Sequence, residues 1–177
     1  KNNCGQWTAD ALRTMFNTDI AFLNAGSIRK DMLKGDITVG DIWEINPFGN
    51  NIMTFSVTGK TIRKMMANNI RMASKDEELN GYDMIIFSGM VIRADPDKIK
   101  DDNDDFLLSI EVNGSHIDLD KTYSVVTNSY TASQAKKYFG DFGEEINAYD
   151  TNVIDRDALL DAVKQQKVIN NVFETRL

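Results

Sequence analysis

Apolar residues recur along the chain at two spacings, and the spacing separates helices from strands. Residues 5–17 repeat Ala9, Leu12 and Phe16 at helical spacing and predict a helix. Residues 58–73 carry a longer stripe of the same period, with the charged residues off the stripe, and predict a more regular helix. Further helices are expected over residues 38–46, over residues 132–139 and from Asp155, which we expect to cap the last one.

Short apolar runs and stretches of alternating residues predict the strands. The run that ends at Leu23 indicates a buried strand, whereas the alternation after Asn51 indicates a strand with one better-buried face. Asn113-Gly114 is the preferred dipeptide of a tight hairpin turn. The expected strands cover residues 19–23, 51–57, two parts of 84–94 separated at Ser88-Gly89, 106–112, 116–119 and 122–127.

Helices and strands are mixed without regular alternation, and the chain has no repeat and no low-complexity linker. The pattern therefore predicts one α+β domain over residues 1–177, with a mixed β-sheet flanked by helices. A composition of 42% hydrophobic and 27% charged residues supplies a core for such a domain. Because the first residues lead straight into an amphipathic pattern, we expect the chain to be a fragment of a longer protein.

The net charge argues against nucleic acid as a partner, and the length of the apolar runs argues against a membrane span. The net charge is −7 and no block of basic residues occurs, which argues against nucleic-acid binding. The apolar runs are far too short for a membrane span.

His116 and Cys4 are the single histidine and the single cysteine, so neither a dinuclear metal centre nor a zinc site is expected in this chain. A Cys–His nucleophilic pair lacks any orienting signature around Cys4.

An acidic stretch raises the alternative of a calcium-stabilised module. Asp101, Asn103 and Asp105 occupy the first three alternate ligand positions of a calcium loop. Phe106 stands where the loop requires Gly, and Val112 stands where it requires a bidentate Glu. A solvated loop between strands is the favoured interpretation.

Two loops have the composition of a binding site. In "NAGSIR", small residues including Gly26 would let a ligand approach the backbone, and Arg29 could bind a phosphate or carboxylate through two hydrogen bonds. In "NPFGN", Phe48 offers a ring face to a planar heterocycle, with the amide of Asn50 two residues on. Composition alone favours plainer alternatives, namely a simple turn with a surface ion pair and a loop Phe that plugs the core.

The ordered motifs "TADAL", "LNAGSIR", "ITVGDIWEINPFGN", "VTGKTIRKMM", "FSGMVIRAD" and "TYSVVTNSYTA" resemble the C-terminal domain of the 5′-nucleotidase family. This family includes ecto-5′-nucleotidases, bacterial UDP-sugar hydrolases and cyclic-nucleotide phosphodiesterase relatives. The likeness runs from about residue 5 to residue 139. It implies a two-domain enzyme in which an N-terminal metallophosphoesterase domain holds a pair of divalent metal ions of the Zn or Mn type. The C-terminal domain would grip the nucleotide and present its phosphate to those metals.

The resemblance also implies roles for individual residues. Phe48 and Tyr130 match the two aromatic residues that sandwich the base, and Arg29 matches the arginine that engages the phosphate or another polar end of the ligand. Asn24 and Asn50 match amides that hydrogen-bond near the base and sugar. The substrate-binding set is Asn24, Gly26, Arg29, Phe48, Gly49, Asn50 and Tyr130. Gly81 and Gly89 lie near family glycines.

The chain departs from the family pattern at the sugar. Lys136 stands where the family usually has an Asp that holds the ribose hydroxyls, and a cation cannot accept those hydrogen bonds. Ala25 also replaces a common Gly. We therefore expect a nucleotide-binding or nucleoside-binding domain that is not catalytic alone, works beside an N-terminal metallophosphoesterase domain, and is periplasmic or extracellular. The alternative is a stand-alone binding or interaction domain that has kept the fold and lost nucleotide recognition.

Overall fold

A computed structural model of the chain describes residues 3–75, 84–99, 103–143, 145–170 and 174–177. The helices are α1 (Asn3–Met15), α2 (Val39–Ile45), α3 (Gly59–Lys75), α4 (Ser129–Ser133), α5 (Ala135–Phe139) and α6 (Asp155–Gln166), with 3₁₀ turns η1 (Ala25–Ser27) and η2 (Pro96–Lys98). The strands are β1 (Ile20–Asn24), β2 (Asn51–Thr58), β3 (Ile85–Ser88), β4 (Met90–Ala94), β5 (Leu107–Val112), β6 (Ser115–His116), β7 (Thr122–Asn128) and β8 (Tyr149–Ile154).

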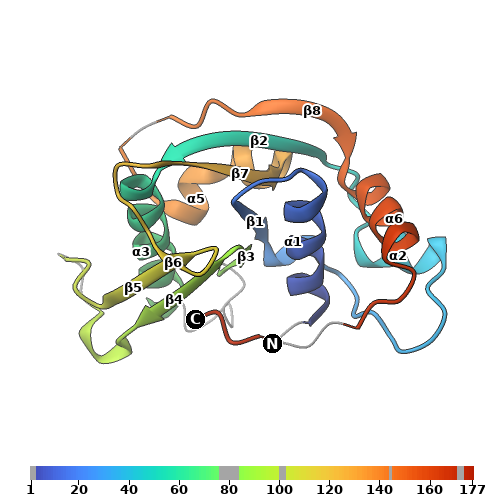
Figure 1. Cartoon of the computed structure of the whole chain (residues 1–177), viewed down its shortest axis with the longest axis horizontal. Coiled ribbons are helices and arrows are strands. Elements are labelled where there is room, and N and C mark those ends of the chain that lie inside the picture. Colours follow the sequence, from blue (N-terminus) through green and yellow to red (C-terminus); the bar gives the residue numbers. More distant parts are fainter. Residues whose placement is uncertain (1–2, 76–83, 100–102, 144, 171–173) are drawn as a thin grey trace.

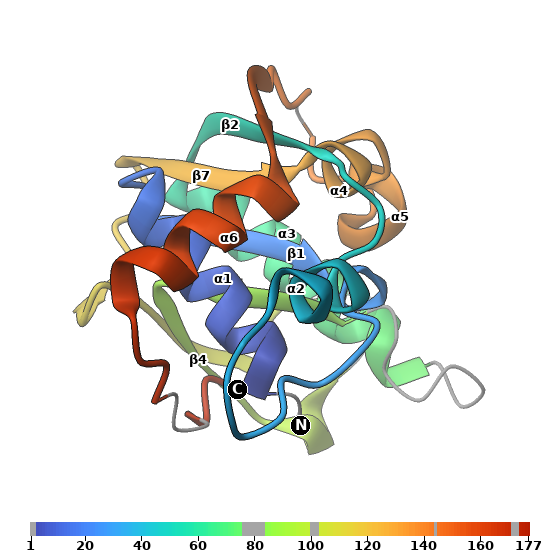
Figure 2. The ribbon, with the colours of Figure 1, turned by 90° about the vertical axis from the view of Figure 1, so that its right-hand side faces the viewer.

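A five-stranded sheet of order β3-β1-β7-β2-β8 forms the centre, and a three-stranded sheet of order β4-β5-β6 lies below it (Figure 1). Helices cover both faces of the central sheet, so its strands carry apolar residues on both sides. Ile20 and Phe22 of β1 join the core beneath α3 and α5. Ala21 and Leu23 join the opposite core beneath α1, α2 and α6, which lie on the near side of the sheet in Figure 2.

The directions of three central strands decide where the functional loops meet. β1 runs parallel to β7, whereas β2 runs antiparallel to β7 with Ile52 opposite Asn128. The carboxyl ends of β1 and β7 therefore lie at the same end of the sheet as the start of β2. That end, here called the loop edge, carries residues 24–29, 46–50 and 128–131.

The predicted fold class is confirmed, since the domain is a mixed sheet flanked by helices, and most predicted elements occur within a few residues of their expected bounds. Thr38 begins α2 with the expected cap: its side chain accepts a hydrogen bond from Asp41 N–H, and the Asp41 carboxylate accepts one from Thr38 N–H. The expected helix over residues 132–139 is wrong in detail, because it divides into α4 and α5 at Gln134.

The prediction of one better-buried face for residues 51–57 is confirmed, because Phe55 and Val57 are buried on one face whereas only Ile52 is buried on the other. Two further predictions need correction. The second hairpin strand is shorter than expected and ends at His116. Asp155 begins α6, but the cap position is Ile154 and no side chain caps the helix. The Asp155 carboxylate instead faces the 46–50 loop, where it accepts a hydrogen bond from Asn50.

Candidate functional site

The first part of the loop edge is the turn that η1 forms after β1. Asn24 is 6% exposed, and its side-chain oxygen accepts hydrogen bonds from Asn128 Nδ2 at 3.3 Å and from Thr131 Oγ at 3.2 Å. A Cβ atom added at Gly26 would lie 3.4 Å from the Asn24 amide nitrogen, so the turn packs close to that amide. The Asn24 amide thus has internal partners that fix the turn.

Arg29 connects this turn to the neighbouring loop. Its backbone N–H donates to the carbonyl of Ile45, the last residue of α2, at 2.8 Å. Its side chain is exposed, with the guanidinium carbon 5.9 Å from the centre of the Phe48 ring. The structure therefore brings Arg29 and Phe48 together, at a distance where the cation and the ring face attract each other.

The 46–50 loop presents Phe48 to solvent. The Phe48 side chain is 56% exposed, so the alternative of a Phe that plugs the core is wrong. Its N–H donates to the side-chain oxygen of buried Asn46 at 3.4 Å. Gly49 has φ +65°, a conformation in which other residues are strained. Asn50 leads into β2, and its side-chain amide lies 3.5 Å from the Asp155 carboxylate.

Tyr130 occupies the third part of the loop edge, in the first turn of α4. Asn128 caps this helix by accepting the N–H of Thr131 at 2.7 Å. The Tyr130 side chain is 43% exposed. The helix α4 packs against β1 and β2, and Asn128, two residues before Tyr130, pairs with Ile52 near the start of β2. Lys136 is exposed on α5, the next helix along the chain.

Burial raises the pKa of two ionisable groups in the described part of the chain, and one of them lies at this edge. Asp155 is 1% exposed, and burial raises the pKa of its carboxyl, although hydrogen bonds from Asn46, Arg156 N–H and Asn50 act in the opposite direction. Cys4 lies in α1, where burial raises the pKa of its thiol to about 11. A thiol of this kind is protonated at neutral pH and is a poor nucleophile. His116 is exposed on β6.

The acidic stretch that raised the calcium alternative is described only in part. Asp101 lies outside the described residues, as does Gly81. In the described part, the guanidinium of Arg71 donates to the carbonyl of Asn103 at 2.8 Å and to the carboxylate of Asp104 at 2.6 Å. This stretch of the loop is thus attached to α3.

No group of three or more His, Cys, Asp or Glu side chains comes together in the described residues. These residues do not fit a metal pair, which the family resemblance implies in the separate N-terminal domain. Nor does any helix within the described ranges combine the length and apolar character needed to span a bilayer.

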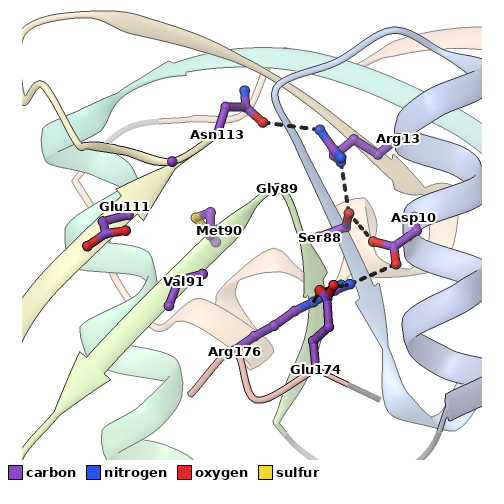
Figure 3. Close-up of a pocket in the computed structure, with 11 residues that line it drawn as sticks. Asp10, Arg13, Ser88, Gly89, Met90, Val91, Glu111, Asn113, Glu174 and Arg176 are labelled. Atoms are coloured by element: carbon purple, nitrogen blue, oxygen red, sulfur yellow. Dashed lines mark hydrogen bonds and ion pairs between the residues drawn. The ribbon is translucent and has the colours of Figure 1, made fainter. Parts of the chain in front are cut away.

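Two cavities lie away from the loop edge. One of about 860 Å³ lies among residues 32–37, the start of α1 and the end of α6. The other, of about 190 Å³, lies between α1, the β3–β4 connection, the β5–β6 turn and the segment 174–177 (Figure 3). Arg13 and Arg176 line this second cavity, which is here called the arginine cavity.

A sequence profile of the C-terminal domain of 5′-nucleotidases matches residues 1–141. The chain belongs to this family. Among curated proteins it is 28% identical to the NAD 5′-nucleotidase of Haemophilus influenzae over 144 residues, which are 76% of this chain and 23% of the relative. It is 29% identical to Endonuclease YhcR of Bacillus subtilis over 130 residues, 73% of this chain and 10% of the relative. The chain thus spans a quarter or less of these two proteins.

Solved structures of 5′-nucleotidases have the same fold. The chain superposes on a 5′-nucleotidase precursor from Thermus thermophilus with a TM-score of 0.78 and 26% identity, covering 98% of this chain and 34% of that one. The Haemophilus influenzae NAD nucleotidase gives a TM-score of 0.74 and 26% identity, covering 93% and 30%. The resemblance inferred from the sequence motifs is therefore confirmed.

Two structural features of the site were missed from the sequence. β8 was not predicted because its residues show no clear alternation of buried and exposed positions. Arg156 stacks on Trp43 with its guanidinium carbon 3.6 Å from the ring centre, a contact that no local pattern signals. Trp43 lies on α2, five residues before Phe48, and is 51% exposed. A tryptophan this close to Phe48 is the one feature of the sequence that points to this contact.

Proposed function

We propose that the chain is the substrate-binding domain of a 5′-nucleotidase-type phosphohydrolase and holds a nucleotide base between Phe48 and Tyr130. One observation carries the proposal: two half-exposed aromatic side chains lie at the same end of the sheet, with Arg29 facing the Phe48 ring. Large aromatic residues are usually well buried, and a ring face turned to solvent can stack on a base. Arg29 supplies the cation for the phosphate or another anionic end of the ligand.

The other proposed site residues support this geometry. Asn50 supplies an amide near the base and sugar, while buried Asn24 holds the turn beneath them through Asn128 and Thr131. Gly26 lets the backbone come close to the ligand, and Gly49 provides the turn that holds Phe48 outward. Lys136 stands at the position of the family's ribose-binding Asp. Because a cation does not accept hydrogen bonds from ribose hydroxyls, we expect the sugar to be recognised differently.

The catalytic half of the reaction is assigned to another part of the protein. We propose that residues 1–177 form one C-terminal-like domain and that a separate N-terminal metallophosphoesterase domain supplies a divalent metal pair of the Zn or Mn type. The parent reaction is hydrolysis of a nucleotide phosphoester, in the periplasm or outside the cell. The pure chain is expected to release no phosphate from AMP with added Mn²⁺ or Zn²⁺, and clear turnover would contradict this assignment.

Calorimetric titration tests the binding proposal. AMP, adenosine and UDP-glucose are titrated into the wild type, Phe48→Ala and the control Tyr149→Ala, which removes an exposed aromatic from β8. Loss of one stacking face is expected to cost Phe48→Ala about 1–3 kcal/mol of binding free energy, while Tyr149→Ala binds as the wild type does. Equal binding by wild type and Phe48→Ala would remove Phe48 from the site. Absence of binding to every nucleotide would favour the alternative, a domain of this fold that has lost nucleotide recognition.

A further inference from the structure

The conformation of the 46–50 loop depends on contacts from outside the loop. It contains Pro47, which has no N–H, and Gly49, whose backbone is the most mobile in an unfolded chain. A loop of this composition needs contacts from outside to fix the direction of Phe48. Those contacts come from the junction between β8 and α6, which the pairing of Asn51 with Ile154 places beside the loop.

Asp155 holds both ends of the loop. Its backbone N–H donates to the carbonyl of Asn50 at 2.8 Å, and its carboxylate accepts hydrogen bonds from the side chains of Asn46 and Asn50. The side-chain oxygen of Asn46 in turn accepts the N–H of Phe48. A chain of hydrogen bonds therefore runs from the Asp155 carboxylate to the backbone of Phe48.

Arg156 holds the middle of the loop. Its Nη1 donates to the Pro47 carbonyl at 3.3 Å, and its guanidinium stacks on Trp43 at 3.6 Å. A Cβ atom at Gly49 would lie 3.3 Å from Nη2, so the guanidinium also packs against the Gly49 backbone. Nε of Arg156 is buried and has no acceptor within the described part of the chain. Stacking on Trp43 and the hydrogen bond to the Pro47 carbonyl therefore orient the guanidinium.

We infer that Arg156 is a positioning residue that fixes the direction of Phe48 without touching the ligand. The inference rests on the proposed function, since it assigns a purpose to a residue behind the proposed base-stacking ring. Arg156 lies beyond residue 141, where the family profile ends, so the family motifs do not identify it. The planar guanidinium is essential to this role, because a lysine can neither stack flat on Trp43 nor keep the same donor geometry towards Pro47.

A double-mutant cycle tests whether Arg156 acts through Phe48. Affinity for AMP is measured for Arg156→Ala and Arg156→Lys in the wild-type and Phe48→Ala backgrounds, with Arg93→Ala, an exposed residue of β4, as the control. We expect either Arg156 variant to weaken binding about tenfold when Phe48 is present, the scale of one lost base stack, and to change little when Phe48 is absent. Equal losses in both backgrounds would overturn the inference, because they indicate direct ligand contact or general destabilisation.

Hydrogen exchange gives a second readout that needs no ligand. Exchange of a peptide covering residues 46–50 is compared between wild type, Arg156→Lys and Arg93→Ala in the free protein. We expect at least a severalfold rise for Arg156→Lys alone, and unchanged exchange would overturn the positioning role. If the wild type binds no nucleotide, the proposed function fails while the exchange experiment still decides whether Arg156 holds the loop.

Discussion

The arginine cavity and the loop edge show that a hollow with charged walls and a binding site are different things. In the arginine cavity, Arg176 donates to Asp10 at 2.7 Å, to Glu174 at 2.9 Å and to the carbonyl of Phe87 at 3.0 Å. Arg13 donates to Ser88 at 2.9 Å and to Asn113 (Figure 3). The two guanidinium groups are thus already engaged by the protein itself.

The loop edge has the opposite character. Phe48 and Tyr130 are about half exposed, and the exposed Arg29 side chain lies over the Phe48 ring. The buried polar groups of this edge, such as Asn24 and Asn128, hydrogen-bond one another below the surface and hold the backbone. Rigid support below and exposed recognition groups above are what a preformed ligand site requires. We therefore expect substitutions in the arginine cavity to change the free energy of unfolding and substitutions at the loop edge to change ligand affinity.

The largest expected effect comes from breaking the arginine cavity. Arg176→Met keeps much of the side-chain volume but removes the hydrogen bonds to Asp10 and Phe87. Leaving a mostly buried carboxylate without its cation is expected to cost about 3 kcal/mol of unfolding free energy, measured by urea denaturation. Arg93→Met, at an exposed position of β4, is the control and should change stability by less than about 0.5 kcal/mol. If Arg176→Met stays folded yet loses nucleotide affinity, the assignment of the two regions is reversed.

The second prediction concerns the other ring of the loop edge. Tyr130→Ala is expected to lose about 1–3 kcal/mol of binding free energy for AMP, with the free energy of unfolding within about 0.5 kcal/mol of the wild type. Tyr130→Phe keeps the ring face and should bind within about 0.5 kcal/mol of the wild type. A loss in Tyr130→Phe equal to that in Tyr130→Ala would show that the hydroxyl, not the ring face, contacts the ligand.

The sequence predicted the elements whose pattern is local. The stripe of α3 and the apolar run of β1 are repeated signals within one segment, and both segments were placed correctly. The capping box at Thr38 is equally local. β8 gave no such signal, because it is an edge strand with exposed Tyr149 and Val153. An edge strand needs no buried alternation, and its place in the fold is set by pairing with β2.

The candidate site likewise has residues that local motifs indicated and contacts that they did not. Motif order indicated Arg29 and Phe48, which lie together, because each stands in a recognisable short loop. Asp155 was expected to cap a helix, since an Asp before an apolar stripe usually does so. It instead accepts hydrogen bonds from Asn46 and Asn50, which are distant in sequence. Contacts of this kind depend on the packing of β8 against β2, which residue patterns alone do not specify.

The smallest expected effect is a change in unfolding free energy when a carboxylate is replaced by an amide. The sign of this change should differ between the two regions. Burial raises the pKa of Asp155 above its ordinary value of 3.8, so the protonated form favours the folded state. That contribution is fully present below about pH 3.8 and is lost as the pH rises through the raised value. Asp155→Asn never ionises. It should therefore become more stable relative to the wild type as the pH rises above about 3.8 and through the raised pKa of Asp155.

Asp10→Asn should instead be less stable than the wild type at pH 7, because the Asp10 carboxylate accepts from Arg176 and an amide is a weaker partner for a guanidinium. Urea denaturation measures the Asp155→Asn trend between pH 3.5 and 7 and the Asp10→Asn loss at pH 7. If Asp155→Asn loses stability relative to the wild type as the pH rises, the ionised Asp155 carboxylate is stabilised by its amide donors after all. The loop edge would then depend on a buried charge as the arginine cavity does, and the contrast between the two regions would rest on exposure alone.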